Sequence, residues 1–530
     1  MLRLDQIHLT PDQPESALRQ KAARLLRISP QRIEEVQILR RAVDAREQLM
    51  LVYTVAVRVD DEAAVLRRCR DRRVSAYTPR PYRLPAPVTA APALSPVVVG
   101  AGPAGLFAAL ILAHAGLHPI ILERGKCAEE RTADVEKFWK TGLLNTESNV
   151  QFGEGGAGAF SDGKLNTGTK DPRHRWILEQ FVSCGAPESI LIDSKPHVGT
   201  DYLHQVLRQL RRKLQALGCE FRFSQRLEQL HHENGVLTGL SVRDSSGQLT
   251  RIPCRQVILA LGHSARDTFE MLYGCGMELE AKPFAVGVRI EHCQKDIDTV
   301  QYKKFAGHPA LGAATYKLSC HLPNGRSVFS FCVCPGGQVV AAASEAERVA
   351  TNGMSEYSRS GENINGALLV NVTPADFPSA HPLAGIEFQR RLEAAAYKIG
   401  GGYLAPCQKV GDFLSGRPSE GPGTVRPSYR PGVVWTDLHR VLPDFIADSL
   451  RQALPVLDRK LPGYAAPDAV LTAVESRSSS PVRIVRDESY QSTRIRGVYP
   501  CGEGAGYAGG ILSAATDGMR CAEQIRGGLQ

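Results

Sequence analysis

The sequence lacks the features that mark several classes of protein. Its first residues, MLRLDQIHLTPDQPE, carry charges around a few apolar positions and no continuous apolar segment, so no signal peptide is expected. The 13 cysteines form no CxxC pair and no metal-ligand spacing, and their odd number indicates reduced thiols. There is no internal repeat, and apart from one proline-rich segment no low-complexity tract. We therefore expect a cytoplasmic protein without a bound metal.

Length and composition are those of a globular protein with several domains. At 530 residues the chain exceeds the size at which one hydrophobic core keeps growing, so two or three domains are expected. The long apolar stretch at residues 92–113 is interrupted by glycine and proline. We interpret it as a buried strand, a tight turn and a buried helix rather than a membrane span. No membrane partner is expected.

The N-terminal region carries much of the positive charge. Residues 1–85 contain 17 Lys and Arg against 11 Asp and Glu, a net charge of +6 within the total of +9. The acids are interleaved with the bases and no aromatic platform accompanies them, so a solvated arginine-rich surface is favoured over a nucleic-acid site. An RNA-binding module remains as an alternative.

Changes in pattern along the chain predict five segments. Short strand-like and helix-like stretches in residues 1–78 indicate a small α+β module of ferredoxin-like type. A proline-rich, fairly stiff linker follows at 79–95. Residues 96–281 begin with a βαβ pattern, which predicts the first part of a Rossmann-like domain with a parallel sheet. An inserted α+β substrate domain is expected at 282–474, and the nucleotide domain resumes at 475–530.

A glycine cluster opens the βαβ unit. Gly100 permits a tight turn after the strand VVV, Gly102 permits close approach to a pyrophosphate, and Gly105 permits close helix packing. The helix that follows directs its positive dipole end toward the ligand. Glu123 ends the next strand 23 residues later, where a carboxylate accepts hydrogen bonds from ribose hydroxyls. This spacing, in this context, predicts a dinucleotide site.

Two later segments indicate which dinucleotide is bound. RQVILALGHSARD, residues 255–267, resembles the second FAD motif of the glutathione-reductase-like flavoproteins, and GVYPCGEGAGYAGGI, residues 497–511, resembles their third. In such proteins the carboxylate at the position of Glu503 holds a ribityl hydroxyl. Because three separated segments converge on one extended ligand, non-covalently bound FAD is preferred to a free nicotinamide.

The glycine spacing at Gly504, Gly506 and Gly509 could also indicate a second nucleotide domain. Such a domain needs a further strand and an acidic residue, but only 21 residues follow Gly509. They are predicted to form one helix whose first turn faces the flavin pyrimidine ring. Because the sequence shows no second nucleotide domain, we expect one of two electron sources. NADH or NADPH binds transiently as the donor, or the substrate itself supplies the electrons.

The resemblance becomes more specific at SNVQFGEGGAGAFSDGKLNTGTKD, residues 148–171. With KPHVGTD at 195–201, CVCPGG at 332–337 and VESRSSSPVRI at 474–484, it is similar to a family of uncharacterised bacterial FAD-dependent dehydrogenases. The resemblance covers nearly the whole chain and implies FAD binding and redox chemistry, but no substrate. The residues predicted to bind the cofactor are Gly100, Gly102, Pro103, Ala104, Gly105, Glu123, Arg124, Gly155, Gly156, Ser161, Lys164, Leu227, Ala260, Gly262, Gly502, Glu503, Gly509, Gly510 and Ile511.

No residue can be assigned to catalysis from the sequence, but four are candidates. His197 and His263 could carry protons near a redox centre, although a hydrogen-bonded loop histidine is the favoured interpretation for each. Arg477, with Arg483 and Arg486, would suit an anionic substrate, and ion-paired loop arginines explain the segment equally well. Tyr507 could stack on the flavin or simply pack. Lys164 could likewise pair with flavin or phosphate charge or be a surface lysine.

Cys332 and Cys334 would share one face of a strand and could approach disulfide distance. We favour small packing residues, because flavin disulfide reductases usually space their cysteines more widely. A redox pair is the alternative.

The function predicted from these features is that of an FAD-dependent oxidoreductase that moves a hydride between flavin and a small substrate. An anionic substrate would suit the arginines near residue 477. A flavin-dependent RNA-modifying protein and a non-catalytic FAD-binding scaffold or sensor are the alternatives. The sequence says nothing of the oligomeric state.

Overall fold

A five-stranded parallel sheet joins the segments that carry the glycine motifs. In the computed structural model, which describes residues 1–90 and 92–529, its strand order is β23-β11-β5-β6-β7. The strands are β5 (Val97–Val99), β6 (Ile120–Leu122), β7 (Glu220–Arg222), β11 (Val257–Leu259) and β23 (Val498–Pro500). Within the described residues it is the only sheet whose strands all run parallel. The three motifs therefore end at one edge of one sheet.

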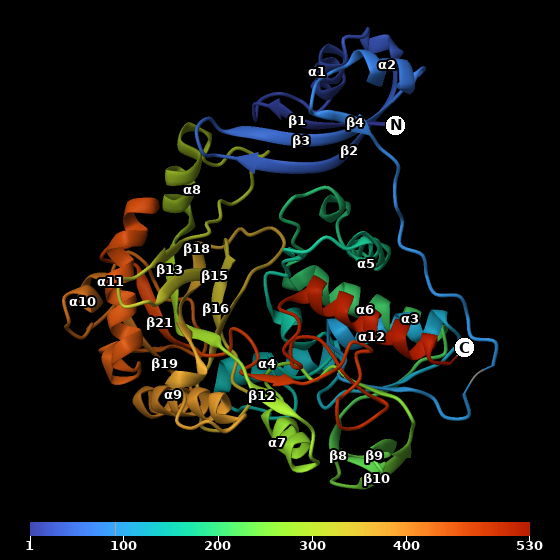
Figure 1. Ribbon diagram of the computed structural model, residues 1–530. Helices are drawn as coiled ribbons and strands as arrows, with labels where there is room; N and C mark the ends of the chain where they lie inside the picture. The colour runs from blue at the N-terminus through green and yellow to red at the C-terminus, as the bar shows by residue number, and fades with distance from the viewer. Residues whose placement is uncertain (91, 530) are drawn as a thin grey trace.

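Two helices pack together over this sheet. The helix α3 (Pro103–His114) is buried on nearly every side because its residues are almost all apolar, and α12 (Ile511–Gly527) lies alongside it (Figure 1). The other helices of this part are α4 (Ala128–Thr141), α5 (Pro172–Ser183), α6 (Gly199–Ala216) and α7 (Arg266–Gly274). A three-stranded sheet is formed by β8 (Gln225–Glu233), β9 (Val236–Asp244) and β10 (Leu249–Pro253).

The middle of the chain forms a seven-stranded, mostly antiparallel sheet. Its order is β14-β15-β18-β13-β21-β19-β20. The strands are β13 (Phe284–Cys293), β14 (Ser319–His321), β15 (Ser327–Cys334), β18 (Asn363–Val372), β19 (Ala405–Lys409), β20 (Val433–Trp435) and β21 (Val470–Glu475). The helices are α8 (Gln294–Tyr302), α9 (Ala384–Gly400), α10 (Val410–Leu414) and α11 (Asp444–Lys460). Two small sheets pair β12 (Leu279–Ala281) with β22 (Val482–Ile484), and β16 (Gln338–Ala341) with β17 (Thr351–Met354).

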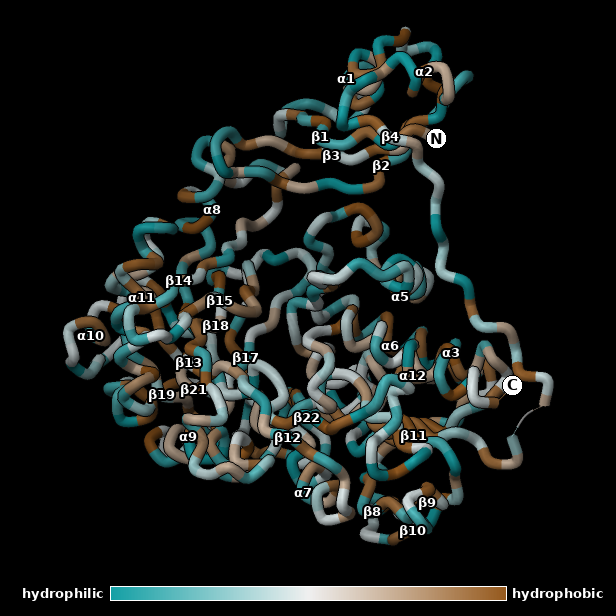
Figure 2. Tube along the Cα trace, in the orientation of Figure 1, coloured by the Kyte–Doolittle hydropathy of each residue, from teal (hydrophilic) through white to brown (hydrophobic). Residues whose placement is uncertain are grey.

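One hydrophobic core runs through both of these parts. It includes Phe107 and Leu512 beside the parallel sheet and Val288 and Leu368 in the seven-stranded sheet. In the hydropathy view the strands of both sheets are brown and the outer helices are partly teal (Figure 2). The continuous core holds the seven-stranded sheet against the edge of the parallel sheet where the glycine motifs lie.

The N-terminal region has a separate core and the element order βαββαβ. It consists of β1 (Leu2–Leu9), α1 (Ala17–Leu26), β2 (Ile33–Asp44), β3 (Met50–Val59), α2 (Glu62–Arg68) and β4 (Val74–Ala76), with sheet order β2-β3-β1-β4. Several of its arginines pair with acids of the same region, at Arg3–Asp5, Arg32–Asp60, Arg46–Asp44 and Arg73–Asp71.

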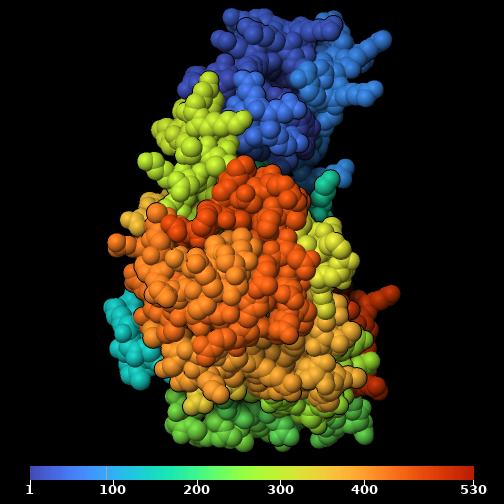
Figure 3. Space-filling model, turned by 90° about the vertical axis from the view of Figure 1, so that its left-hand side faces the viewer, coloured from blue at the N-terminus to red at the C-terminus, as the bar shows by residue number. Residues whose placement is uncertain are grey.

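Polar contacts join this region to the rest of the chain. Arg41 donates to a carboxylate oxygen of Asp193 at 2.9 Å, and the imidazole of His308 lies 3.3 Å from Asp12. Figure 3 shows the N-terminal region resting on the segment that includes α8. The linker predicted at 79–95 contains residue 91, which lies outside the described residues. Near it, Val88 donates its backbone N–H to Ala115 at 3.0 Å, so the linker lies against the end of α3.

None of the helices among residues 1–90 and 92–529 is both long and apolar enough to cross a membrane.

Candidate functional site

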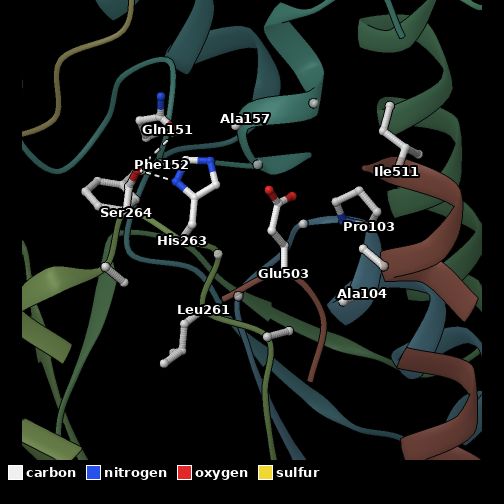
Figure 4. Close-up of a pocket in the computed structure, with 18 of the residues that line it drawn as sticks. Pro103, Ala104, Gln151, Phe152, Ala157, Leu261, His263, Ser264, Glu503 and Ile511 are labelled. Atoms are coloured by element: carbon white, nitrogen blue, oxygen red, sulfur yellow. Dashed lines mark hydrogen bonds between the residues drawn. The ribbon is translucent and has the colours of Figure 1, made fainter. Parts of the chain in front are cut away.

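A cavity of about 370 Å³ opens where the parallel sheet meets the middle region. Its walls come from the turns after β5, β6, β11 and β23, from residues 151–166, and from the strands β15 and β21. Figure 4 shows side chains from these distant segments facing one another across it. Most of the predicted cofactor-binding residues lie in this lining: Gly100, Gly102, Pro103, Ala104, Glu123, Arg124, Gly156, Ser161, Lys164, Leu227, Ala260, Gly262, Glu503, Gly509, Gly510 and Ile511.

The first glycine turn is shaped by close backbone contacts. Gly100 has φ +104°, and a Cβ there would be 2.2 Å from the carbonyl oxygen of Ala260. Gly102 precedes the first turn of α3, and a Cβ on it would lie 3.9 Å from the Cα of Gly156. Gly105 does not line the cavity: a Cβ on it would meet the carbonyl oxygen of Gly100 at 1.9 Å, so this glycine permits the helix to pack beneath the turn.

Glu123 connects the first glycine turn to the long glycine-rich segment. Its carboxylate accepts backbone N–H groups of Ala101 at 2.8 Å, Gly125 at 2.9 Å and Gly153 at 3.0 Å. A carboxylate has about four acceptor positions, so about one remains for a ligand hydroxyl. Beside it in the lining, the buried side-chain oxygen of Gln225 has no hydrogen-bond partner.

Arg124 is held at the mouth of the cavity by acids from two other segments. It donates to Glu147 at 3.0 Å and to Asp267 at 2.9 Å, and its guanidinium lies 4.0 Å over the ring of Phe152. Burial opposes its charge, but these hydrogen bonds and carboxylates outweigh it and raise the pKa of Arg124 above its ordinary value. The planar guanidinium is therefore fixed rather than free to move.

The segment 148–160 is organised by an arginine that the sequence did not single out. The side chain of Arg131, fully buried, donates to the backbone carbonyls of Asn149 and Val150 at 2.8 Å each and of Glu154 at 2.7 Å. It holds the segment in the shape that faces the first glycine turn. Gly155 does not line the cavity, because it packs against Leu207 instead.

Lys164 lies in the lining but is paired with an acid. Its ammonium is 2.8 Å from Asp162, which also accepts from Arg359 at 2.9 Å. Burial alone would raise the pKa of Asp162, but the charges of Lys164 and Arg359 outweigh it and hold the pKa at about 2. Lys164 is therefore a partly buried, ion-paired lysine.

The third motif places Glu503 in the cavity. Its carboxylate lies 3.5 Å from the backbone nitrogen of Gly510, just before α12 (Figure 4). Burial raises the pKa of Glu503 to about 7. Gly502 is not in the lining, since it turns the chain behind the cavity and donates its N–H to Asp517 at 2.8 Å.

Two of the four catalytic candidates lie away from the cavity. His197 stacks on Tyr357 and bonds to its carbonyl oxygen at 3.1 Å. Tyr507 packs under the guanidinium of Arg486 at 3.8 Å, and Arg486 in turn donates to Asp517 at 2.7 Å. These contacts agree with a hydrogen-bonded loop histidine at His197 and with ordinary packing at Tyr507.

Arg477 lines the cavity, yet most of its donors are directed away from it. Together with Arg266 it surrounds the fully buried carboxylate of Glu393, donating at 2.9 and 2.8 Å. Arg477 is therefore paired within the protein and is not free to bind an anionic substrate. His263 also lines the cavity, bonded to Ser264 at 3.0 Å (Figure 4). Burial, together with nearby Arg477 and Arg266, lowers its pKa to about 3, which leaves the imidazole neutral.

The middle region contributes a wall that sequence reasoning missed. Phe331, Cys332, Asn352 and Glu475, hereafter the middle-region wall, all line the cavity. Burial raises the pKa of Glu475 to about 7. A signal was present, because Cys332 and Glu475 both lie in segments that carry the family resemblance. The sequence suggested Cys332 only as one of a cysteine pair, and in the segment that holds Glu475 only the arginines were considered.

Comparisons with known proteins indicate which cofactor the chain binds. Residues 94–271 match the family described as FAD binding domain, and residues 283–478 match the family described as FAD-dependent protein, C-terminal domain-like. Residues 1–60 match a domain family of unknown function. An uncharacterized protein from Clostridium beijerinckii is 46% identical over 528 residues, covering 99% of this chain and 98% of its own.

This chain belongs to a family of FAD-dependent proteins. FAD is its cofactor, and the prediction of an FAD-dependent oxidoreductase is confirmed. The residues present fit that cofactor. The paired glycines Gly102 and Gly156 leave open backbone where a Cβ would project, and Gln225 offers an unpartnered acceptor at the Glu123 end.

Solved structures resemble the chain only distantly. The flavin-dependent brominase Bmp2 is 13% identical, with a TM-score of 0.37 over 82% of this chain and 79% of that one. A flavoprotein/dehydrogenase from Cytophaga hutchinsonii is 12% identical, with a TM-score of 0.36 over 82% and 79%.

Proposed function

We propose that this protein transfers a hydride between FAD and a small-molecule substrate bound against the middle-region wall. The observation that carries the proposal is the convergence of three chain segments, after β5, β11 and β23, on one cavity that the middle region closes. It supports a glutathione-reductase-like placement of FAD, in a Rossmann-like domain with an inserted α+β substrate domain. The ferredoxin-like module at the N-terminus is an appendage to these two in this proposal.

In this proposal, different residues of the chain contact different parts of FAD. The N-terminus of α3 and the glycines beside it receive the pyrophosphate, because free backbone N–H groups and the helix dipole favour an anion there. Glu123, Arg124 and Leu227 surround the adenosine. Glu503 accepts a ribityl hydroxyl, and the first turn of α12 lies at the flavin ring. FAD, when bound, supplies a two-electron redox centre.

Proton transfer at the substrate end is assigned to Glu475. Its carboxyl lies in the middle-region wall, and burial brings its pKa to about 7, so both protonation states are populated near neutral pH. His263 stays neutral under the same conditions and serves as a hydrogen-bonding side chain. Since Arg477 and Arg486 are engaged by Glu393 and Asp517, the proposal assigns no charge to the substrate.

The test begins with purified protein incubated with FAD and passed through a desalting column. We expect flavin absorbance to co-elute with the chain and to be released by acid denaturation, as for a non-covalent cofactor. Protein that retains no flavin would overturn the proposal. Anaerobic mixing of the flavin-loaded protein with NADH or NADPH then shows whether a nicotinamide reduces it, in which case the nicotinamide binds transiently, or whether the substrate must supply electrons.

A further inference from the structure

The strand β15 departs from regular geometry at Cys332. Phe331 pairs with Ala367 on β18, whereas Cys334 pairs with Asn365, so β15 holds one extra residue across this step. Cys332 has φ +41°, in the left-handed region. A regular strand would separate the two cysteine Cα atoms by nearly the longest distance a disulfide spans, about 6.8 Å. A bulge bends the strand and changes the direction of its side chains, so the regular spacing does not apply here.

The two thiols interact with each other in this bulge. A hydrogen bond between them is the largest effect on both thiols, lowering the pKa of Cys332 and raising that of Cys334. The Cys334 thiol also donates to the carbonyl oxygen of Cys332 at 3.3 Å. Both cysteines are free thiols in the structure. The opposite pKa shifts favour the thiolate at Cys332 and the protonated thiol at Cys334.

Two cations surround this pair. Arg289, fully buried, donates to the carbonyl oxygen of Cys332 at 3.0 Å and lies 3.8 Å from the sulfur of Cys334. Lys164 donates to the carbonyl oxygen of Val333, the residue between the two cysteines. The nearest carboxylate to Arg289 is Glu475, at 3.6 Å, which is beyond hydrogen-bond distance. The charge of this incompletely paired guanidinium acts to lower the pKa of both thiols.

A second cysteine pair at the cavity has a different charge environment. Cys501 also lines the cavity and contacts Cys521, but the neighbouring carboxylate is Asp517. Burial raises the pKa of Cys501 well above its ordinary value, so that thiol keeps its proton. Arg486 lies 3.7 Å from the Cys521 sulfur, but both of its terminal nitrogens donate to the carboxylate of Asp517, whereas Arg289 has no carboxylate of the described residues within hydrogen-bond distance.

We propose that Cys332 and Cys334 form a redox-active dithiol that exchanges two electrons with FAD, a proposal that rests on the flavin placement given above. Cys332 lies in the cavity wall and Cys334 is buried behind it. In oxidation, the Cys332 thiolate and the Cys334 thiol form one Sγ–Sγ bond. Two electrons and the thiol proton pass to FAD, which becomes the anionic reduced flavin. The reverse reaction opens the disulfide and restores thiolate and thiol.

The experiment counts reducing equivalents. FAD-loaded protein, oxidised in air and made anaerobic, is titrated with dithionite while flavin absorbance is followed. We expect the wild-type protein to take up two electrons more than its flavin alone accepts. Cys332→Ser and Cys334→Ser should each lose these two electrons. Cys320→Ser, a buried cysteine on β14 outside the cavity lining, should behave as wild type.

A second readout does not depend on flavin reduction. The oxidised and reduced proteins are denatured with an alkylating reagent, and the peptides are analysed by mass spectrometry. We expect Cys332 and Cys334 to be protected together in the oxidised sample, and Cys501 and Cys521 to be alkylated in both. If FAD is bound and reduced yet the uptake matches the Cys332→Ser variant and Cys332 is fully alkylated, the dithiol proposal is wrong. If no FAD is retained, the proposed function itself has failed.

Discussion

Gly518 on α12 lies directly against the backbone of Ala104 on α3: a Cβ at Gly518 would be 2.0 Å from the carbonyl oxygen of Ala104. This contact brings the helix of the third motif against the helix of the first, so that both begin at the same cavity. The relationship joins residues 414 positions apart and fixes the two helix starts relative to each other.

Gly518→Ala should therefore destabilise the protein and disturb the cavity together. Because backbone atoms of both helices must move, we expect a loss of ~1–3 kcal/mol in the free energy of unfolding and weaker FAD retention. Gly527→Ala is the matched control, since this glycine ends the same helix and a Cβ there meets nothing within 4 Å. Denaturant unfolding checks both variants. Equal stability of the two would show that the helix contact is not tight.

Gly102→Ala separates cofactor binding from stability. Gly102 has φ −78°, and its Cβ would lie no closer than 3.9 Å to the protein, at the Cα of Gly156. The added methyl group would occupy the cavity where we place the pyrophosphate. We expect the stability of the FAD-free protein to change by no more than about 1 kcal/mol, and the Kd for FAD to rise at least roughly tenfold.

The control for this variant is Gly274→Ala, at the open end of α7 and outside the cavity lining. Its Kd for FAD, measured by flavin fluorescence quenching, should equal that of the wild type. An unchanged Kd in Gly102→Ala would show that the pyrophosphate does not approach this glycine.

The sequence predicts the first and third glycine motifs well because each combines local signals. Strand, glycine spacing and helix start are all set within about a dozen residues around Gly100 and Gly509, and local propensities decide such turns. The helices that the sequence predicts after both motifs are present as α3 and α12. What it misses depends on partners far along the chain, as with Arg131, whose acceptors are 18 to 25 residues away.

Arg477 and Tyr507 are residues that the sequence suggested for the site and that the structure pairs elsewhere. Arg477 was a candidate because it belongs to an arginine-rich stretch, and Tyr507 because it lies within the third glycine motif. Their partners decide otherwise, because Glu393 on α9 engages Arg477 and the Arg486 guanidinium covers Tyr507. The bulge at Cys332 is a further example, since it exists only in the pairing of β15 with β18.

Ionisation of Glu503 should lower the stability of the FAD-free protein and strengthen the binding of FAD. Its folded pKa of about 7 exceeds the ordinary 4.5, so the folded FAD-free protein binds more protons between these values. Stability therefore falls as pH rises from about 4.5 to 7. Glu503→Gln removes this contribution and should be more stable than wild type at pH ~8, with little difference at pH ~4.

The same variant should bind FAD less tightly at pH ~8, because it loses a charged acceptor for the ribityl hydroxyl, worth ~1.5–3 kcal/mol. Glu488→Gln, at an exposed position, serves as control for both measurements. If Glu503→Gln were less stable at high pH, or bound FAD as well as wild type, the assignment of this carboxylate would be wrong.

Glu393 tests whether Arg477 acts in structure rather than in substrate binding. Burial would raise the pKa of Glu393, but the charges and hydrogen bonds of Arg266 and Arg477 outweigh it and hold the pKa below the ordinary 4.5. A carboxyl with a lowered pKa stabilises the fold above its ordinary pKa and loses that effect as pH falls below about 4.5. Glu393→Gln leaves the buried Arg477 without its carboxylate partner and Arg266 with Glu345 alone, which should cost ~3–5 kcal/mol.

We expect the thermal midpoint of Glu393→Gln to be well below that of wild type at neutral pH, with the gap narrowing on acidification. Glu387→Gln, an exposed position on the same helix, should change stability by no more than ~0.5 kcal/mol. Arg477→Lys should follow Glu393→Gln in losing stability, because one ammonium cannot replace the forked pair of hydrogen bonds. An Arg477→Lys protein of wild-type stability would return Arg477 to the list of substrate-binding candidates.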